Sequence, residues 1–193
     1  MARDRDARTA DAKQRLFLAV EVPPAAEELV VAAIRSWREA FPDARWVAAE
    51  LWHVTLMFLG WTEPRLVPWV ERIVEGVVAG HPPVAATVQG FGAFPSTRRA
   101  RVLWAGIDDP ARGLADLVDD LGIALAERYP AEARPFHAHL TVARSDPPIR
   151  LPASYVETPL ASEPFVVDRV VLFRSHPGRV TRYEPLRMFA LGA

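Results

Sequence analysis

A four-residue pattern occurs twice in this chain, and it limits the possible folds more than any other feature. Residues 53–56 (His-Val-Thr-Leu) and 139–142 (His-Leu-Thr-Val) each consist of a histidine, an apolar residue, a threonine and a second apolar residue. Both lie in apolar runs typical of β-strands, in which residues i and i+2 point to the same face. Each strand is therefore predicted to bury aliphatic side chains on one face and to present an imidazole and a hydroxyl on the other.

Two such strands lying side by side would place both histidines in one cleft with a hydroxyl beside each. Because an imidazole has an unperturbed pKa near 6.5, one ring can be neutral and the other protonated at neutral pH. The neutral ring can take a proton from water, and the protonated ring can give one to a leaving oxygen. The hydroxyls of Thr55 and Thr141 can donate to phosphate oxygens where charge builds. The two motifs therefore favour phosphodiester cleavage with His53 and His139 as catalytic residues and no metal.

Composition excludes several other classes of protein. The 193 residues are 50% hydrophobic with a net charge of −1, which is enough for a core but gives no general basic field for nucleic acid. Without cysteine there is no disulfide and no thiolate metal site. No apolar run reaches the length of a membrane span, and residues 1–14 lack the apolar segment of a secretory signal. We expect a cytoplasmic protein with a disordered tail over 1–14 and one domain over 15–193.

Strand-like and helix-like patterns alternate along the chain, in a similar order before each motif. Helical spacing or start signals predict helices in 24–41, 64–77 and 110–129, with strands in 15–22, 45–47, 52–59, 84–91, 101–107, 136–144, 165–173 and 182–190. A proline-rich loop is expected over 146–164. This order predicts an α+β fold of two related lobes, whose antiparallel sheets face each other across a central groove with the helices outside.

The other three histidines each have a simple structural interpretation. His137 lies two residues before His139, a spacing that also occurs in metal sites. Because there is no cysteine and carboxylates are distant in sequence, we expect His137 to support the strand entrance and the site to contain no metal. His81 and His176 precede prolines and are expected in surface loops.

Arginines and aromatic residues near the motifs leave two readings open. Arg144 follows His139 at an odd offset, which in a regular strand points away from the groove, so it is either a surface residue or a phosphate contact at the strand end. The cluster at 98, 99 and 101 is either a solvated hairpin tip or a contact for the RNA backbone. Phe17 is expected in the core, although its strand can line the groove as part of a substrate-binding surface.

The motifs and their surroundings resemble the two-histidine phosphoesterase superfamily, and within it the LigT/ThpR-like RNA 2′,3′-cyclic phosphodiesterases. Outside the two motifs, the resemblance covers the opening strand 15–20, the Phe-Leu-Gly ending at 58–60, the strand 101–106 and the segment 181–186. Ala138 is a departure, because the family commonly has proline there. This change relaxes the entry to the strand and removes no functional group.

The resemblance implies a bilobal fold with pseudo-twofold symmetry and metal-free hydrolysis of RNA 2′,3′-cyclic phosphate ends to 2′-phosphates. It implies that His53 protonates the leaving 3′ oxygen, that His139 takes a proton from water, and that Thr55, Thr141 and Arg144 hold the phosphate. Joining of RNA ends through a 2′,5′ linkage is implied as related chemistry. We expect RNA or an oligonucleotide as partner, no cofactor, no membrane and a monomer.

Two alternatives to this reading are a cyclic phosphodiesterase for a small nucleotide and a nucleotide-binding module without turnover. The arginines at 98, 99 and 101 favour a longer RNA over the first, because an RNA has more phosphates to contact. The presence of both motif histidines argues against the second, since loss of turnover would show first at the catalytic pair.

Overall fold

The computed structural model describes residues 12–130, 132, 134–178 and 181–192. Within them, the strands form one path in which every pairing is antiparallel. The strands are β1 (Gln14–Val20), β2 (Arg45–Trp46), β3 (Val54–Thr62), β4 (Val84–Phe94), β5 (Ala100–Asp108), β6 (His139–Ile149), β7 (Phe165–Val167), β8 (Arg169–His176) and β9 (Arg182–Ala190). Their order is β7-β4-β5-β6-β3-β1-β8-β9, and β2 lies alongside β6.

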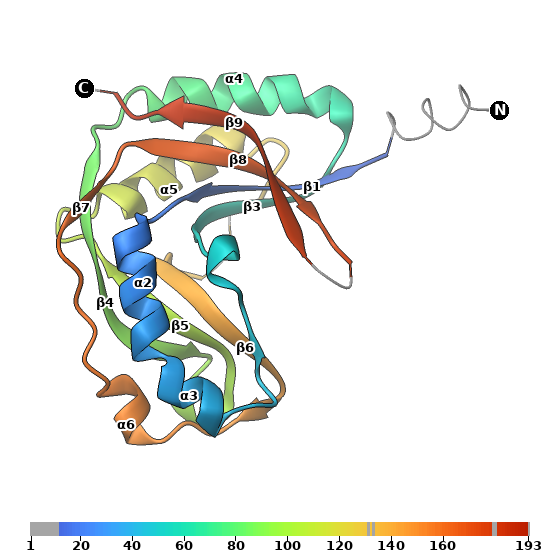
Figure 1. The fold of residues 1–193 in the computed structure, drawn as a ribbon. Coiled ribbons are helices and arrows are strands. Elements are labelled where there is room, and N and C mark those ends of the chain that lie inside the picture. The colour runs from blue at the N-terminus through green and yellow to red at the C-terminus, as the bar shows by residue number, and fades with distance from the viewer. Residues whose placement is uncertain (1–11, 131, 133, 179–180, 193) are drawn as a thin grey trace.

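The two motif strands, β3 and β6, lie at the centre of this path. They are joined through a single residue pair, Val54 with Leu140, so a group of four strands and a group of five, counting β2, meet at one narrow contact. Figure 1 shows the groups running in clearly different directions. Strand order is matched outward from the centre, β3-β1-β8 on one side and β6-β5-β4 on the other. The α+β prediction is confirmed, but the two predicted sheets are one continuous hydrogen-bonded path.

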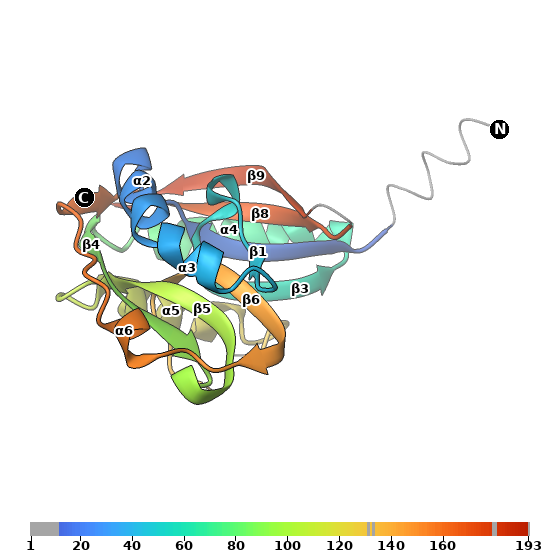
Figure 2. The ribbon, with the colours of Figure 1, turned by 60° about the horizontal axis from the view of Figure 1, so that its bottom comes forward.

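The longer helices cover the sheet with apolar stripes. The helices are α2 (Pro24–Ala33), α3 (Arg35–Ala40), α4 (Val67–Val78), α5 (Gly113–Leu125) and α6 (Ala153–Val156), with single 3-10 turns η1 (Ala49–Leu51), η2 (Pro64–Leu66) and η3 (Thr97–Arg99). Helices α4 and α5 pack against each other and against β3, β8 and β9. Figure 2 shows α2 and α3 in front of the strands, with α4 and α5 behind them. None of the described helices is both long and apolar enough to span a membrane.

Helix α3 and β2 connect the two groups of strands. Both come from the first half of the chain, yet β2 pairs with β6, and the indole nitrogen of Trp37 in α3 donates to the Thr158 hydroxyl at 3.0 Å. The Trp37 ring also contacts Tyr155 of α6 edge-on at 5.5 Å between centroids. These contacts attach β6 and the segment around α6 to parts of the chain that precede the first motif.

Several predicted boundaries were wrong, each for a local reason. The helix predicted over 24–41 divides at Ile34 into α2 and α3. The proline-rich stretch contains the end of β6 and the short α6, because Pro147 and Pro148 lie where pairing with β5 is irregular and a missing N–H breaks no ladder bond. The strand predicted over 165–173 is two strands with different partners, β7 beside β4 and β8 beside β1 and β9.

The first strand begins one residue earlier than the sequence predicted. Residues 1–11 of the predicted tail lie outside the described residues, whereas Gln14, predicted to belong to the tail, is the first residue of β1 and pairs with Thr62. Gly60, expected to end the first motif strand, lies inside β3 with φ +65°, a conformation that side chains other than glycine rarely adopt.

Candidate active site

The first motif strand presents a row of residues on the face of the sheet that carries Thr55, called here the groove face. Paired residues of an antiparallel ladder point to the same face. The β1–β3 ladder pairs Ala19 with Thr55 and Phe17 with Phe58. Leu56 is an extra residue in β3 between these pairs and forms a bulge. The bulge shifts the alternation of faces along β3 by one residue. Phe58 therefore faces the groove three residues after Thr55.

The second motif strand repeats this geometry. The β5–β6 ladder pairs Trp104 with Thr141 and Val102 with Arg144, and Val142 is the extra residue between them. Val142 and Ala143 are both buried, as expected where a bulge interrupts the alternation of faces. Arg144 therefore returns to the groove face three residues after Thr141. The odd offset that left Arg144 ambiguous in the sequence is cancelled by one bulged residue.

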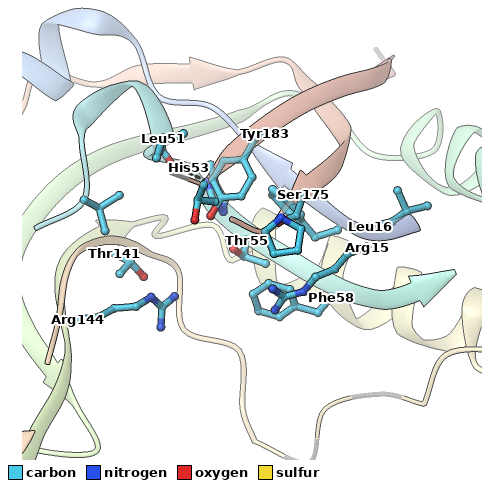
Figure 3. Close-up of a pocket in the computed structure, with 14 residues that line it drawn as sticks. Arg15, Leu16, Leu51, His53, Thr55, Phe58, Thr141, Arg144, Ser175 and Tyr183 are labelled. Atoms are coloured by element: carbon cyan, nitrogen blue, oxygen red, sulfur yellow. Dashed lines mark hydrogen bonds between the residues drawn. The ribbon is translucent and has the colours of Figure 1, made fainter. Parts of the chain in front are cut away.

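A cavity of about 390 Å³ opens on the groove face between the two motif strands. Figure 3 shows Thr141 and Arg144 on one side of it, His53 and Thr55 in the middle, and Arg15 and Phe58 on the other side. The predicted residues His53, Thr55, Thr141, Arg144 and Phe17 all line this cavity. The full lining is Arg15, Leu16, Phe17, Val47, Leu51, His53, Thr55, Phe58, Thr141, Arg144, Ser175, Pro177, Thr181 and Tyr183.

His139 is not among the residues that line the cavity. It is the first residue of β6, next to Leu140, which forms the only Cα pair that β6 makes with β3 in the described ladder. His139 is close enough for its positive charge to contribute to lowering the pKa of His53. The two histidines therefore belong to one electrostatic unit on either side of the central strand contact.

Both histidines are held in the same way. The Nδ1 atom of His53 lies 2.8 Å from the Leu51 carbonyl oxygen, and that of His139 lies 2.7 Å from the His137 carbonyl oxygen. A carbonyl oxygen can only accept, so Nδ1 of each ring carries the hydrogen. Nε2 of each ring remains available as an acceptor in the neutral ring and as a donor in the protonated one. One backbone contact thus fixes both the tautomer and the orientation.

Aromatic rings surround His53 on the groove face. The ring centroids of Phe17 and Tyr183 lie 4.8 Å and 5.1 Å from that of His53, and Tyr183 meets it edge-on. Phe17 belongs to a small apolar cluster with Ala19, Val171 and Phe173, separate from the main core. Phe17 is only 3% exposed, yet it lines the cavity. It is therefore both a buried residue and part of the groove, the two positions that the sequence left open for it.

His139 lies in a different aromatic setting. Its ring contacts Phe94 edge-on at 5.1 Å between centroids, and His137 lies 4.6 Å from Trp104. Gly92 of β4 makes room for Trp104, because a Cβ at Gly92 would come within 2.1 Å of the indole ring. His137 therefore supports His139 through its backbone carbonyl while its own ring packs on Trp104.

Burial lowers the pKa of both motif histidines below the ordinary imidazole value. Desolvation is the largest cause for each ring, because the low-dielectric surroundings disfavour the imidazolium. The backbone hydrogen bonds to Leu51 and His137 oppose the change, whereas the Arg144 guanidinium lowers both pKa values further. An anion bound between these groups would reverse the effect, since its negative charge favours the protonated rings.

None of the remaining polar candidates is among the residues that line the cavity, although His176 lies between two that are. His81 pairs with Asp120 at 3.0 Å, in the bend after α4. His176 was expected in a loop, but it ends β8, with its Nε2 atom 2.7 Å from Glu184. Arg101 pairs with Asp146 at 2.8 Å, while Arg98 and Arg99 are exposed in η3. In the described part of the chain, no group of three or more histidine, aspartate or glutamate side chains is arranged to hold a metal ion.

Sequence reasoning did not single out Arg15, Phe58 or Tyr183 as residues of this site. Tyr183 could have been found from its place inside the segment 181–186, which resembles the family. Arg15 lies two residues before Phe17 on β1, so regular alternation places both on one face, whereas the position of Phe58 depends on the bulge at Leu56.

The fold and this arrangement define a two-histidine phosphoesterase-type protein, and comparison with known proteins agrees. Residues 22–179 match the 2′-5′ RNA ligase superfamily, and the chain belongs to that family. Within the family it is a LigT-like homologue of RNA 2′,3′-cyclic phosphodiesterases. The Escherichia coli K12 protein of that name is 31% identical over 186 residues, which is 92% of this chain and 97% of the relative.

Two further comparisons describe the extent of the likeness. A Geobacillus stearothermophilus protein also named RNA 2′,3′-cyclic phosphodiesterase is 29% identical over 184 residues, which is 93% of this chain but only 58% of that relative. The crystal structure of E. coli LigT complexed with 3′-AMP has a TM-score of 0.74 and 30% identity, covering 93% of this chain and 98% of LigT. The chain therefore matches LigT over nearly its whole length and the Geobacillus protein over little more than half.

Proposed function

We propose that this protein hydrolyses RNA 2′,3′-cyclic phosphate ends to 2′-phosphates by acid–base catalysis, without a metal ion. The observation that carries the proposal is the matched pair of histidines. Each has its Nδ1 atom bound to a backbone carbonyl two residues earlier and its Nε2 atom left for substrate, and each precedes a groove-face threonine. Two relatives named for this activity support the choice of substrate.

The reaction needs one proton removed and one supplied. Nε2 of neutral His139 takes a proton from water as the water oxygen attacks phosphorus. The bond between phosphorus and the 3′ oxygen breaks, and Nε2 of protonated His53 gives its proton to that oxygen. The products are a 3′-hydroxyl and a 2′-phosphate, with His139 now protonated and His53 neutral. Return to the starting state requires one proton to leave His139 and one to reach His53, so solvent completes the cycle.

The threonines and Arg144 stabilise the charge that develops on the phosphoryl oxygens. Thr55 and Thr141 come from opposite strand groups, so their hydroxyls approach the cavity from two sides. Arg144 offers a planar guanidinium that can donate two hydrogen bonds to one phosphate. An RNA 5′-hydroxyl in place of water would undergo the same activation and give a 2′,5′ linkage, which is how the ligation associated with this family fits the same groups.

The test is incubation with an RNA that ends in a 2′,3′-cyclic phosphate, in the presence of EDTA. The expected product carries a 2′-phosphate, identified by its resistance to a phosphatase that acts only on 3′-phosphates. Turnover abolished by EDTA and restored by a divalent ion would contradict the metal-free mechanism. A 3′-phosphate product would mean that the 2′ oxygen is the leaving group and that the substrate binds in the opposite sense.

A further inference from the structure

Beside the catalytic cavity, β3 carries two large aromatic side chains that are mostly exposed. Phe58 is 52% exposed and Trp61 is 60% exposed. Phe58 lines the cavity, whereas Trp61 lies beyond the lining residues. Aromatic rings of this size usually gain stability by burial, so two of them at successive groove-face positions call for a binding role.

The strand ladder shows where Trp61 points. Continuing the β1–β3 register past Phe17 and Phe58, the next groove-face pair is Arg15 with Trp61. Leu59 is a second bulged residue between these pairs, and Gly60 adopts its φ of +65° beside it. As the bulge at Leu56 does for Phe58, the bulge at Leu59 keeps Trp61 on the groove face. Thr55, Phe58 and Trp61 therefore form one row that leads outward from the phosphate-binding end.

Arg15 adds a positive charge at the outer end of this row. It is exposed, lines the cavity and pairs with Ser175 of β8 on its other side. Arg15 thus lies in the ladder between a cavity wall and Trp61. The spacing of successive groove-face pairs on β1 is two residues, which is about 6.8 Å along a strand. Moving outward on the groove face, the Phe17–Phe58 pair is therefore followed by the Arg15–Trp61 pair, at a spacing suited to adjacent nucleotides.

We propose that Trp61 and Arg15 form a subsite for the nucleotide that precedes the cyclic-phosphate end of a single-stranded RNA. The inference rests on the proposed function and narrows its substrate to oligonucleotides. The terminal nucleoside occupies the cavity beside Phe58, the base of the preceding nucleotide stacks on Trp61, and Arg15 contacts the phosphate that joins them. Aromatic platforms interleaved with cations are the usual means of holding single strands without reading sequence.

Charge and position favour this occupant over a protein or a second copy of the chain. The row is continuous with the cavity, and Arg15 lies where the phosphodiester of an extended strand would leave the site. An apolar partner would gain no favourable contact from an exposed guanidinium beside Trp61. The overall charge of −1 offers no general attraction for RNA, so the backbone must be held by local groups such as Arg15.

The first test measures substrate-length preference. The kcat/KM of the wild-type protein is compared on 2′,3′-cyclic AMP and on oligoadenylates of two to five nucleotides with a 2′,3′-cyclic phosphate end. Trp61→Ala is expected to lower the oligonucleotide-to-mononucleotide ratio roughly tenfold, the scale of one lost base–aromatic stack, and Trp61→Phe to retain most of it. Ile123→Ala, an exposed apolar truncation on α5, is the matched control and should leave the ratio unchanged.

Arg15→Gln should lower the same ratio and also weaken its dependence on salt, because one phosphate contact is lost. Arg65→Gln, which removes an exposed arginine of η2, serves as its control. A Trp61→Ala ratio equal to that of wild type would overturn the proposal. This includes the case in which both substrates lose the same fraction of kcat/KM, because Trp61 would then have a structural effect on the whole site.

Binding separates this proposal from the proposed function. Affinities for 3′-AMP and for a fluorescein-labelled triadenylate with a 3′-phosphate are measured on the His53→Ala, His139→Ala double variant, with and without Trp61→Ala. If wild type shows no turnover but Trp61→Ala selectively weakens the triadenylate, the subsite holds and the proposed function fails. A triadenylate that binds no more tightly than 3′-AMP would overturn the subsite even if turnover is observed.

Discussion

Phe58 of β3 and Arg144 of β6 occupy corresponding places in the two halves of the protein. Each lies three residues after its motif threonine and returns to the groove face across one bulged residue, Leu56 or Val142. The two-fold resemblance of the motifs therefore extends beyond the histidines and threonines to the irregularities of the strands. The two side chains themselves differ, because one half presents a phenyl ring and the other a guanidinium. We expect this asymmetry to give the substrate one preferred direction across the two motifs.

Arg144→Gln should change both the rate and the pH dependence. Loss of the guanidinium removes a charged hydrogen-bond donor, worth about 1.5–3 kcal/mol, so kcat/KM should fall about ten- to a hundredfold. Because Arg144 lowers the pKa of both histidines, its removal should move both limbs of the pH–rate profile to higher pH. Full rate–pH curves for wild type and variant provide the measurement. A lower rate with unmoved limbs would place Arg144 farther from the histidines than the structure has it.

The kcat/KM of the wild-type protein should be highest at a pH below 6.5, the ordinary pKa of an imidazole. The pKa of each motif histidine is lowered from 6.5, so both limbs of the kcat/KM profile, which reports the free enzyme, should lie below that value. Bound phosphate raises both pKa values, so the kcat profile should be displaced to higher pH. The limbs belong to the coupled pair rather than to either ring alone. A kcat/KM optimum well above 6.5 would contradict the burial of the two rings.

Thr55→Val and Thr141→Val should fold normally and turn over slowly. Valine is close to threonine in shape and suits a strand, while the hydroxyl is lost. If the lost bond acts only in the transition state, kcat should fall about ten- to a hundredfold for each variant. Thermal unfolding temperatures measured alongside the rates provide the control for folding. Wild-type rates in both variants would make the threonines structural.

Gly106, which pairs with His139 across the β5–β6 ladder, should be intolerant of a side chain. A Cβ at this position would come within 2.6 Å of the Gln89 backbone oxygen, which cannot move without shifting β4. Gly106→Ala should therefore lower the free energy of unfolding by about 1–3 kcal/mol. Gly76→Ala is the matched control, because a Cβ there meets nothing within 4 Å and the site is inside α4, where alanine is preferred by about 0.5–1 kcal/mol. Chemical denaturation should show that Gly106→Ala is less stable than wild type and that Gly76→Ala is more stable.

The parts of the site that depend on regular strands were predictable from sequence. Alternation alone put His53 with Thr55, and His139 with Thr141, on one face. Arg144, Phe58 and Trp61 were not predictable in this way, because each is displaced by a bulge that depends on pairing with a neighbouring strand. The break of the first helix at Ile34 and the strand that contains Pro147 and Pro148 were missed for a similar reason. In both, tertiary packing and irregular pairing outweigh the local pattern.

The contacts that position the histidines were also beyond sequence reasoning. The His137 carbonyl that binds Nδ1 of His139 is a backbone group, so the identity of residue 137 carries no sign of it. The same holds for Leu51 and His53. His137 attracted attention as a possible metal ligand, but the structure accounts for its ring through Trp104 and for its carbonyl through His139.

The assignment of His53 as proton donor and His139 as proton acceptor is tested most directly by how the rates depend on the leaving group. Rates of His53→Ala and His139→Ala are compared on the RNA cyclic phosphate and on a phosphodiester with a nitrophenolate leaving group, which needs no proton. The substrate must be one that the wild-type protein hydrolyses. His53→Ala should recover much of its lost activity on the nitrophenyl substrate, whereas His139→Ala should stay defective on both. Recovery of His139→Ala alone would reverse the roles, and equal defects on both substrates would contradict acid catalysis by either ring.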